Sequence, residues 1–293
     1  MMSIEDAFGK FRTRLETTDR ENATASARQQ RIREQLASDL EIAEDFLTGS
    51  YRRQTKTKPL RDIDIMVVLR DTNFLNRDPA AILKEVVQIL EPYYPGRVVS
   101  DRRAVRVDFG VARVTDLDDE IISFDVVPAF ADGDNYLIPD DILGEWISTN
   151  PRIHAELATR ANKDFADQWK PLIKMIKKWN QESGSPVQPG FLLEVMALDI
   201  LSGPWTGRHP YELRGFFATA ADRIDEGWPD PAGLGPDVSD VLDNDPAAMA
   251  VSRRALGEAE AACTRAIKHD QAGRTGEALA EWQRLFGSLF AKS

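Results

Sequence analysis

The spacing of hydrophobic residues predicts a helical N-terminal region and a further helix downstream. Between residues 4 and 47, apolar side chains recur at intervals of three and four among charged residues: Ile32, Leu36, Leu40, Ala43 and Leu47. Such spacing gathers them on one face of a helix, so we expect a long N-terminal helix. A second helix is predicted at about Pro79–Leu90.

Three stretches between residues 60 and 130 have the pattern of β-strands. Ile63–Leu69 is a short apolar run, and Arg103–Val114 alternates between apolar and charged residues. The third is Ile121–Phe130, which we expect to end at Pro128 because proline cannot donate to a sheet ladder. Asp116–Glu120 is a plausible hairpin connection. These stretches predict a small mixed sheet.

The remainder of the chain, from about Asp140 onward, is predicted to be helical. Residues 165–181 carry one apolar stripe: Trp169, Leu172, Ile173, Ile176 and Trp179. Residues 189–201 are apolar almost all round, which predicts a buried helix. Two further helices are expected at about 247–269 and 276–290, after a loop rich in Pro, Gly and Asp.

This change of pattern predicts an α+β fold. The length of 293 residues suits one large domain or two small ones. We place the α/β lobe at residues 1–150 and the helical lobe at residues 151–293.

Composition and charge restrict the class of protein. With 48 acidic and 37 basic residues the formal charge is −11, which disfavours non-specific binding to DNA or to anionic membranes. A single cysteine, Cys263, excludes a disulfide framework and a cysteine-based zinc site. No apolar stretch reaches 18 residues, and the first residues lack a signal-peptide core. We expect a cytoplasmic protein without a membrane segment.

The stretch from Gly49 to Leu69 carries the candidate chemistry. Asp62 and Asp64 open a strand one residue apart, so both carboxylates lie on one face and are suited to Mg²⁺. Asp-x-Asp alone is common at strand starts, but here it follows a Gly-Ser turn, which can bind phosphate oxygens. Asp125 is the best third acid; its rival Asp108 alternates regularly and is assigned to solvent.

At this point the sequence resembles a known family. "TGSYRRQTKTKPLRDIDIMVVL", followed by "SFDVVPAF", is similar to the polymerase-β-like nucleotidyltransferases, and within them to the bacterial cGAS/DncV-like enzymes (CD-NTases). "LIKMIKKWNQ" and "EWQRLFGSLF" resemble later parts of the same enzymes. The resemblance implies a polymerase-β-like core, with a small mixed sheet flanked by helices, packed on a C-terminal helical bundle.

The resemblance also implies roles for individual residues. Asp62, Asp64 and Asp125 would be catalytic and would hold two Mg²⁺ ions, for which Mn²⁺ can substitute. The implied nucleotide contacts are Gly49, Ser50, Thr55, Lys174, Lys177 and Phe191. Without the resemblance, a lysine-rich helix face is usually solvated, and Phe191 could equally belong to the core.

The implied activity is the condensation of nucleoside triphosphates, ATP among them, into a cyclic di- or trinucleotide. Such products serve as second messengers in anti-phage defence and are detected by an effector encoded elsewhere. An alternative is transfer of a nucleotide to an RNA end, a protein or a small molecule. A third hypothesis is a catalytically silent nucleotide sensor, which the three retained aspartates disfavour.

Overall fold

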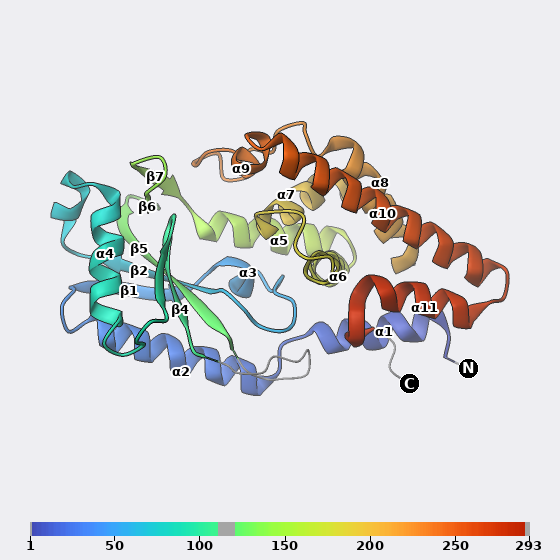
Figure 1. Ribbon diagram of the computed structural model, residues 1–293, viewed down its shortest axis with the longest axis horizontal. Coiled ribbons are helices and arrows are strands. Elements are labelled where there is room, and N and C mark those ends of the chain that lie inside the picture. Colours follow the sequence, from blue (N-terminus) through green and yellow to red (C-terminus); the bar gives the residue numbers. More distant parts are fainter. Residues whose placement is uncertain (1, 111–120, 291–293) are drawn as a thin grey trace. The chain divides into compact units, whose positions relative to one another are not determined.

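The computed structural model describes residues 2–110 and 121–290, which form two compact units (Figure 1). Unit 1 comprises Met1–Glu16 and Glu156–Ser293, and unit 2 comprises Thr17–Ala155. The expected hairpin at Asp116–Glu120 lies outside the described residues. Helices and a small mixed sheet make up the structure, which confirms the predicted α+β class.

Unit 2 is built on a sheet with the strand order β1-β2-β5-β4-β3. Its five strands are β1 (Ile42–Leu47), β2 (Ile63–Leu69), β3 (Val98–Asp101), β4 (Ala104–Asp108) and β5 (Ser123–Asp132). β2 and β5 are parallel, and the other neighbours are antiparallel. The far end of β5 pairs with β6 (Asn135–Asp140), which pairs with β7 (Glu145–Thr149).

One face of this sheet is buried under helices. The side chains of Ile63, Ile65 and Val67 on β2 form a core with α2 (Asp19–Leu36) and α4 (Pro79–Leu90). Successive side chains of a strand point to opposite faces, so the residues between them lie on the face turned away from α2 and α4. Asp64 is one of these.

The N-terminal region departs from the prediction of one long helix. It forms α1 (Ile4–Leu15) and α2, and Ile42–Leu47 is a strand instead of helix. Thr18 begins α2 with a capping box, since its hydroxyl accepts from the Glu21 N–H while the Glu21 carboxylate accepts from the Thr18 N–H. Ile42–Leu47 becomes β1 because it pairs with the edge of β2, a tertiary contact that overrides the local spacing.

Two further strand predictions were wrong. β5 continues through Pro128 to Asp132. It does so because pairing with β4 ends at Val126 and pairing with β6 begins at Phe130, so only β2 flanks the strand at the proline. β7 lies within the stretch after Asp140 that was predicted to be helical.

Unit 1 is helical. Its elements are α1, α5 (Pro151–Asp164, which starts in unit 2), α6 (Trp169–Glu182), α7 (Gly190–Ile200), α8 (His209–Arg223), α9 (Asp240–Asp243), α10 (Pro246–Gln271) and α11 (Thr275–Phe286). All five residues of the predicted apolar stripe on α6 are buried. Two short 3₁₀ helices, at Thr72–Asn76 in unit 2 and Gly287–Leu289 in unit 1, and α3 (Gly49–Arg52) in unit 2 complete the set.

The position of α1 changes the predicted division of the chain. Its Phe8 and Phe11 pack against aromatic rings at the C-terminal end, including Trp282, Phe286 and Phe290. Burial of these rings stabilises α1 within the helical unit. The first 16 residues therefore belong with residues 156–293, whereas the sequence-based boundary placed them in the α/β lobe.

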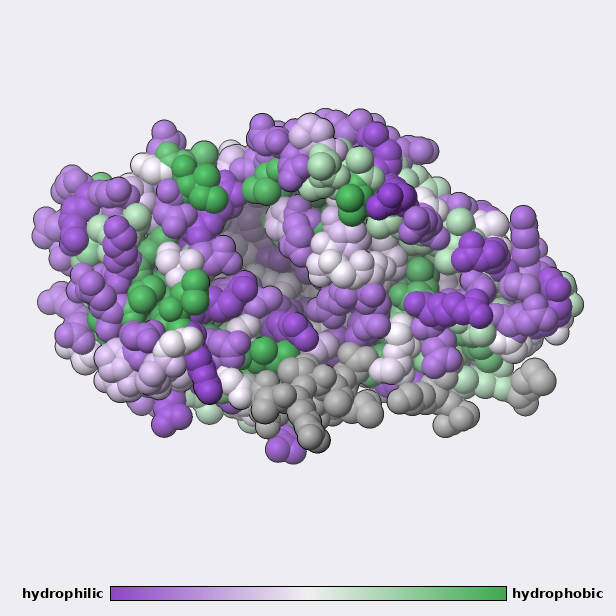
Figure 2. Space-filling model, viewed as in Figure 1, coloured by the Kyte–Doolittle hydropathy of each residue, from purple (hydrophilic) through white to green (hydrophobic). Residues whose placement is uncertain are grey.

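The visible surface is largely hydrophilic, with small scattered hydrophobic areas (Figure 2). Within the described residues, no helix combines the length and the apolar character that crossing a bilayer requires.

Candidate active site

Three charged side chains form a row across the centre of the sheet in unit 2. Asp64 on β2 is the register partner of Asp125 on β5, and Asp125 is the register partner of Arg106 on β4. Neighbouring strands lie about 4.8 Å apart, so side chains in such a row are in direct reach of one another. The row lies on the same face as Met66 and Val68, away from α2 and α4.

The charges around Asp125 are only partly compensated. Arg106 Nε donates to Asp125 Oδ1 at 3.2 Å and lies 3.6 Å from Asp62 Oδ1, while Arg106 Nη2 is 3.5 Å from Asp101 Oδ2. The pKa of Asp125 is raised to about 6: burial is the largest cause, the nearby carboxylates of Asp64 and Asp62 also raise it, and Arg106 lowers it. The cluster therefore favours binding of further positive charge.

Asp62 is held by contacts on both its backbone and its side chain. Its N–H donates to Ser123 Oγ at 3.0 Å, and Ser123 Oγ–H donates to Asp62 Oδ1 at 2.8 Å. Lys56 Nζ donates to the Asp62 carbonyl oxygen at 2.9 Å. Asp62 has a φ of +50°, a conformation that is uncommon outside glycine. These bonds stabilise it and fix the carboxylate on the sheet.

The Gly49-Ser50 turn lies directly against Asp64. A methyl group on Gly49 would come within 1.6 Å of Asp64 Oδ2, and Gly49 has a φ of +58°. The Thr48 N–H donates to the Asp64 carbonyl oxygen at 2.9 Å, and the Thr55 N–H donates to the Ser50 carbonyl oxygen at 2.9 Å. Glycine is required here by both the backbone conformation and the close approach. The backbone of the turn and a carboxylate of the row thus share one small space.

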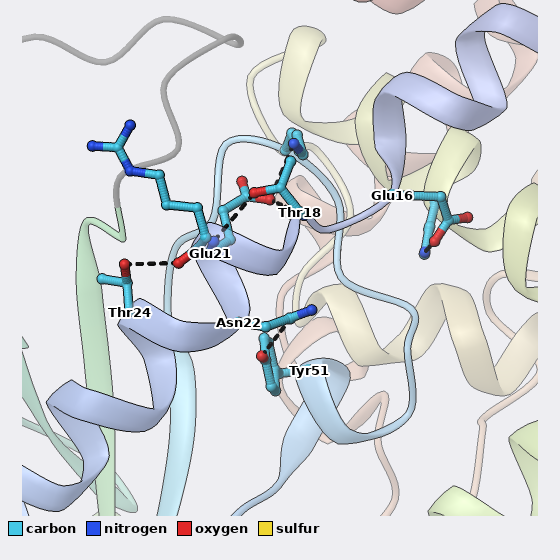
Figure 3. A network of polar contacts seen from close by, with 9 residues as sticks. Glu16, Thr18, Glu21, Asn22, Thr24 and Tyr51 are labelled. Atoms are coloured by element: carbon cyan, nitrogen blue, oxygen red, sulfur yellow. Dashed lines mark hydrogen bonds and ion pairs between the residues drawn. The ribbon is translucent and has the colours of Figure 1, made fainter.

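A polar network joins the start of α2 to α3 and to the loop behind it (Figure 3). Tyr51, on α3, donates its hydroxyl to Asn22 Oδ1 at 2.7 Å. Lys58 Nζ lies 3.1 Å from the carboxylate of Glu21, and both side chains are buried. The loop between the Gly-Ser turn and β2 is therefore fixed by a buried ion pair, a role for Lys58 that the sequence alone did not reveal.

Removing one partner of this buried pair should destabilise the protein. Lys58→Met leaves the Glu21 carboxylate buried without its cation, and we expect the free energy of unfolding to fall by about 3 kcal/mol. The control is Arg253→Met, which breaks the exposed pair with Asp225 and should cost about 1 kcal/mol or less. Urea denaturation measures both, and equal losses would contradict the role given to the buried pair.

The acids at this site suit a divalent metal. Asp64 and Asp125 in the row, and Asp62 beside it, offer hard oxygen ligands of the kind that Mg²⁺ prefers. As they stand, no group of three or more Asp, Glu, His or Cys side chains in the described residues is gathered closely enough to hold a metal ion. Arg106 lies between two of the carboxylates. The incompletely compensated charge at Asp125 nevertheless fits a bound cation.

The pKa of Asp125 gives a testable pH dependence of stability. Because this pKa lies above its ordinary value of 3.8, the folded state binds more protons than the unfolded state between about pH 4 and 6. The free energy of unfolding therefore falls as the pH rises through that range. Asp125→Asn removes this cost, so in EDTA at pH 7.5 we expect it to be more stable than wild type by up to about 3 kcal/mol.

Urea denaturation at pH 4.5 and 7.5 checks this expectation. The advantage of Asp125→Asn should shrink at pH 4.5, where the wild-type carboxyl is protonated in the folded state. An advantage independent of pH would contradict the raised pKa.

The remaining candidate residues belong to unit 1. Three lysines of α6 are ion-paired there: Lys174 with Glu16, Lys177 with Glu194 and Lys178 with Glu182. Lys174 and Lys178 are buried, so the alternative of a solvated lysine face does not hold for them; their paired carboxylates allow these lysines to be buried. Phe191 is partly buried against the core of unit 1.

Sequence reasoning missed Arg106 and Ser123. Both lie on strands adjoining the acids, but their proximity depends on which strands are neighbours, which the pattern of a single strand does not reveal. The signal available for Arg106 was its alternation with the buried Val105 and Val107, which puts it on the face of the acids once β4 lies beside β5. Asp108 is exposed, as expected.

Residues 2–162, more than half of the chain, match a family model described as "Second Messenger Oligonucleotide or Dinucleotide Synthetase domain". Two curated proteins with similar sequences are also named as cyclic nucleotide synthases. The chain is 29% identical over 280 residues to a probable cyclic nucleotide synthase of Bacillus cereus, covering 83% of this chain and 80% of that relative. It is 34% identical over 162 residues to a cyclic AMP-AMP-AMP synthase of Acinetobacter sp., covering 52% and 44% respectively.

A solved structure confirms the fold. The CD-NTase CdnG of Bradyrhizobium diazoefficiens, in complex with GTP, superposes with a TM-score of 0.73 over 97% of this chain and 94% of its own, at 14% identity. The predicted polymerase-β-like architecture is therefore correct.

Proposed function

Because the chain belongs to the second messenger oligonucleotide or dinucleotide synthetases, we propose that it condenses nucleoside triphosphates into a cyclic di- or trinucleotide with the help of magnesium. Its family makes the chain a nucleotidyltransferase that synthesises cyclic oligonucleotides. Enzymes of this kind use divalent metal ions. The choice of Mg²⁺, the number of two ions and substitution by Mn²⁺ are part of the proposal.

The row of Asp64 and Asp125 beside the Gly49-Ser50 turn carries the proposal. It sets carboxylates suited to metal ions against backbone suited to phosphate, within one small space. Asp62, Asp64 and Asp125 would hold the ions, which when bound supply charge stabilisation for the transferring phosphoryl group. The chain positions the acceptor 2′- or 3′-hydroxyl for attack on an α-phosphate, and pyrophosphate leaves.

The nucleotide contacts are proposals for both units. Gly49 and Ser50 would bind the triphosphate of the donor nucleotide, and Thr55 would support them through its bonds to the Ser50 carbonyl oxygen. In unit 1, Lys174 and Lys177 would contact phosphates by exchanging their glutamate partners for phosphate oxygens, which offer a similar charge-assisted bond. Phe191 would stack on a base.

The proposal also covers the substrate, the product and the biological role of the product. One relative is named a cyclic AMP-AMP-AMP synthase, so ATP is the first substrate to test. We propose that the product is a second messenger of anti-phage defence, that an effector encoded elsewhere detects it, and that the enzyme acts in the cytoplasm. The acidic chain fits small nucleotides better than polymeric nucleic acid.

Pyrophosphate release tests the reaction and separates it from the alternatives. The purified chain is incubated with all four nucleoside triphosphates and Mg²⁺ or Mn²⁺, with and without an added RNA, protein or aminoglycoside acceptor. We expect release of pyrophosphate without any acceptor. Release only with an acceptor would favour transfer to an RNA end, a protein or a small molecule. Nucleotide binding without release would favour a silent sensor.

A further inference from the structure

Arg106 occupies a particular place among the acids of the row. Its Nε contacts the Oδ1 atoms of both Asp125 and Asp62, at 3.2 and 3.6 Å, and its Nη2 reaches Asp101. The side chain is half-exposed, with 43% of its surface accessible, whereas that of Asp125 is 15% exposed. The guanidinium of Arg106 thus contacts two of the three carboxylates that are proposed to bind metal ions.

The charge balance shows what this contact does. Asp62, Asp64 and Asp125 together bring three negative charges to one face, and Arg106 returns one positive charge. Lys56, a further cation at this position, donates to the backbone carbonyl oxygen of Asp62. Arg106 therefore lowers the repulsion between these carboxylates. It contacts the same carboxylate oxygen atoms that a metal ion would need as ligands.

We propose that Arg106 is a positioning residue that competes with divalent ions for the carboxylates of Asp125 and Asp62 and so lowers the metal affinity of the protein without nucleotide. A triphosphate adds negative charge and oxygen ligands of its own, which shifts this balance toward the metal. Metal and nucleotide then bind cooperatively. This inference rests on the proposed function, because it assumes that the row holds metal ions.

A purely structural role for Arg106 predicts the opposite sign. If the arginine only holds Asp125 in place, its removal misplaces a ligand and weakens metal binding. If it competes, its removal leaves the carboxylates more negative and strengthens metal binding. A cation within about 4 Å changes the affinity of a carboxylate for positive charge by a factor of 10 or more. Because Arg106 is half-exposed, we expect its effect on metal affinity to be at the lower end of this range, about tenfold.

The test is Mn²⁺ binding to the nucleotide-free protein, measured by electron paramagnetic resonance of the free ion. Arg106→Gln should bind Mn²⁺ about tenfold more tightly than wild type. Arg106→Lys, which keeps the charge, should stay within about threefold of wild type. Arg61→Gln is the matched control: this exposed residue next to Asp62 carries the same charge, and its loss should leave the affinity nearly unchanged.

The outcomes separate this inference from the proposed function. Equal or weaker Mn²⁺ binding by Arg106→Gln, with normal binding by wild type, overturns the competition alone. Absence of Mn²⁺ binding by both wild type and Arg106→Gln, or binding that Asp64→Asn leaves intact, overturns the metal site and the competition with it. If Arg106→Gln is unfolded in EDTA, competition requires that millimolar Mn²⁺ restores its fold, as seen by circular dichroism; failure to do so contradicts the inference.

Discussion

We expect Asp64→Asn to abolish pyrophosphate release while the protein stays folded. Asp64 lies at one end of the row, next to Asp125 on the neighbouring strand and against the Gly49 turn. Asparagine keeps the shape but loses the negative charge that the proposed ions require. We expect the rate to fall at least about 10³-fold, which corresponds to roughly 4 kcal/mol of transition-state stabilisation.

A coupled pyrophosphate assay measures this loss, and circular dichroism with thermal melting checks the fold. Asp108→Asn is the matched control: Asp108 is an exposed acid of the same sheet, on β4, and we expect this variant to retain most of the activity. Retained turnover in Asp64→Asn would contradict the assignment of the metal ligands.

Gly49→Ala should be nearly as damaging, although it adds a single methyl group. The methyl would come within 1.6 Å of Asp64 Oδ2, so either the turn or the carboxylate must move, and alanine disfavours a φ of +58°. A displacement of about 1 Å in an active site can cost about 10²-fold in rate. We expect a loss of that size or more, with a modest loss of stability.

Gly133→Ala separates the clash from the strain. Gly133 lies in the turn between β5 and β6 with a φ of +61°, and a methyl group there would meet none of the described atoms within 4 Å. Both variants bear the same backbone cost, about 1 kcal/mol, but only Gly49→Ala disturbs Asp64. Similar activities of the two variants would contradict the close packing of the turn against the acid.

The sequence predicted those elements whose pattern is local. β2 and α4 have the predicted bounds, Ile63–Leu69 and Pro79–Leu90. A buried apolar run and an amphipathic stripe can be recognised in the sequence without knowing which elements they pack against. Strand alternation correctly placed Asp64 on the same face as Asp125. Asp62 precedes β2 with a φ of +50°, so it is not part of that alternation; its carboxylate joins the cluster through Ser123 and Arg106.

What the sequence did not predict depends on long-range contacts. Ile42–Leu47 has helical spacing but forms a strand, because the edge of β2 offers a partner. Lys174 and Lys178 of α6 are buried because Glu16, which follows α1, and Glu182 of α6 itself neutralise them. Arg106 approaches Asp125 only through the order of the strands. Each case requires knowing which elements are neighbours.

Mass analysis of the product tests the central claim most directly. The chain is incubated with ATP alone and with all four nucleoside triphosphates in the presence of Mg²⁺, and the mixture is then treated with phosphatase. A cyclic oligonucleotide has no terminal phosphate, so we predict a phosphatase-resistant product with the mass of two or three nucleotide monophosphate units joined in a ring, absent with Asp64→Asn. Pyrophosphate release that yields only phosphatase-sensitive linear products would contradict cyclic oligonucleotide synthesis.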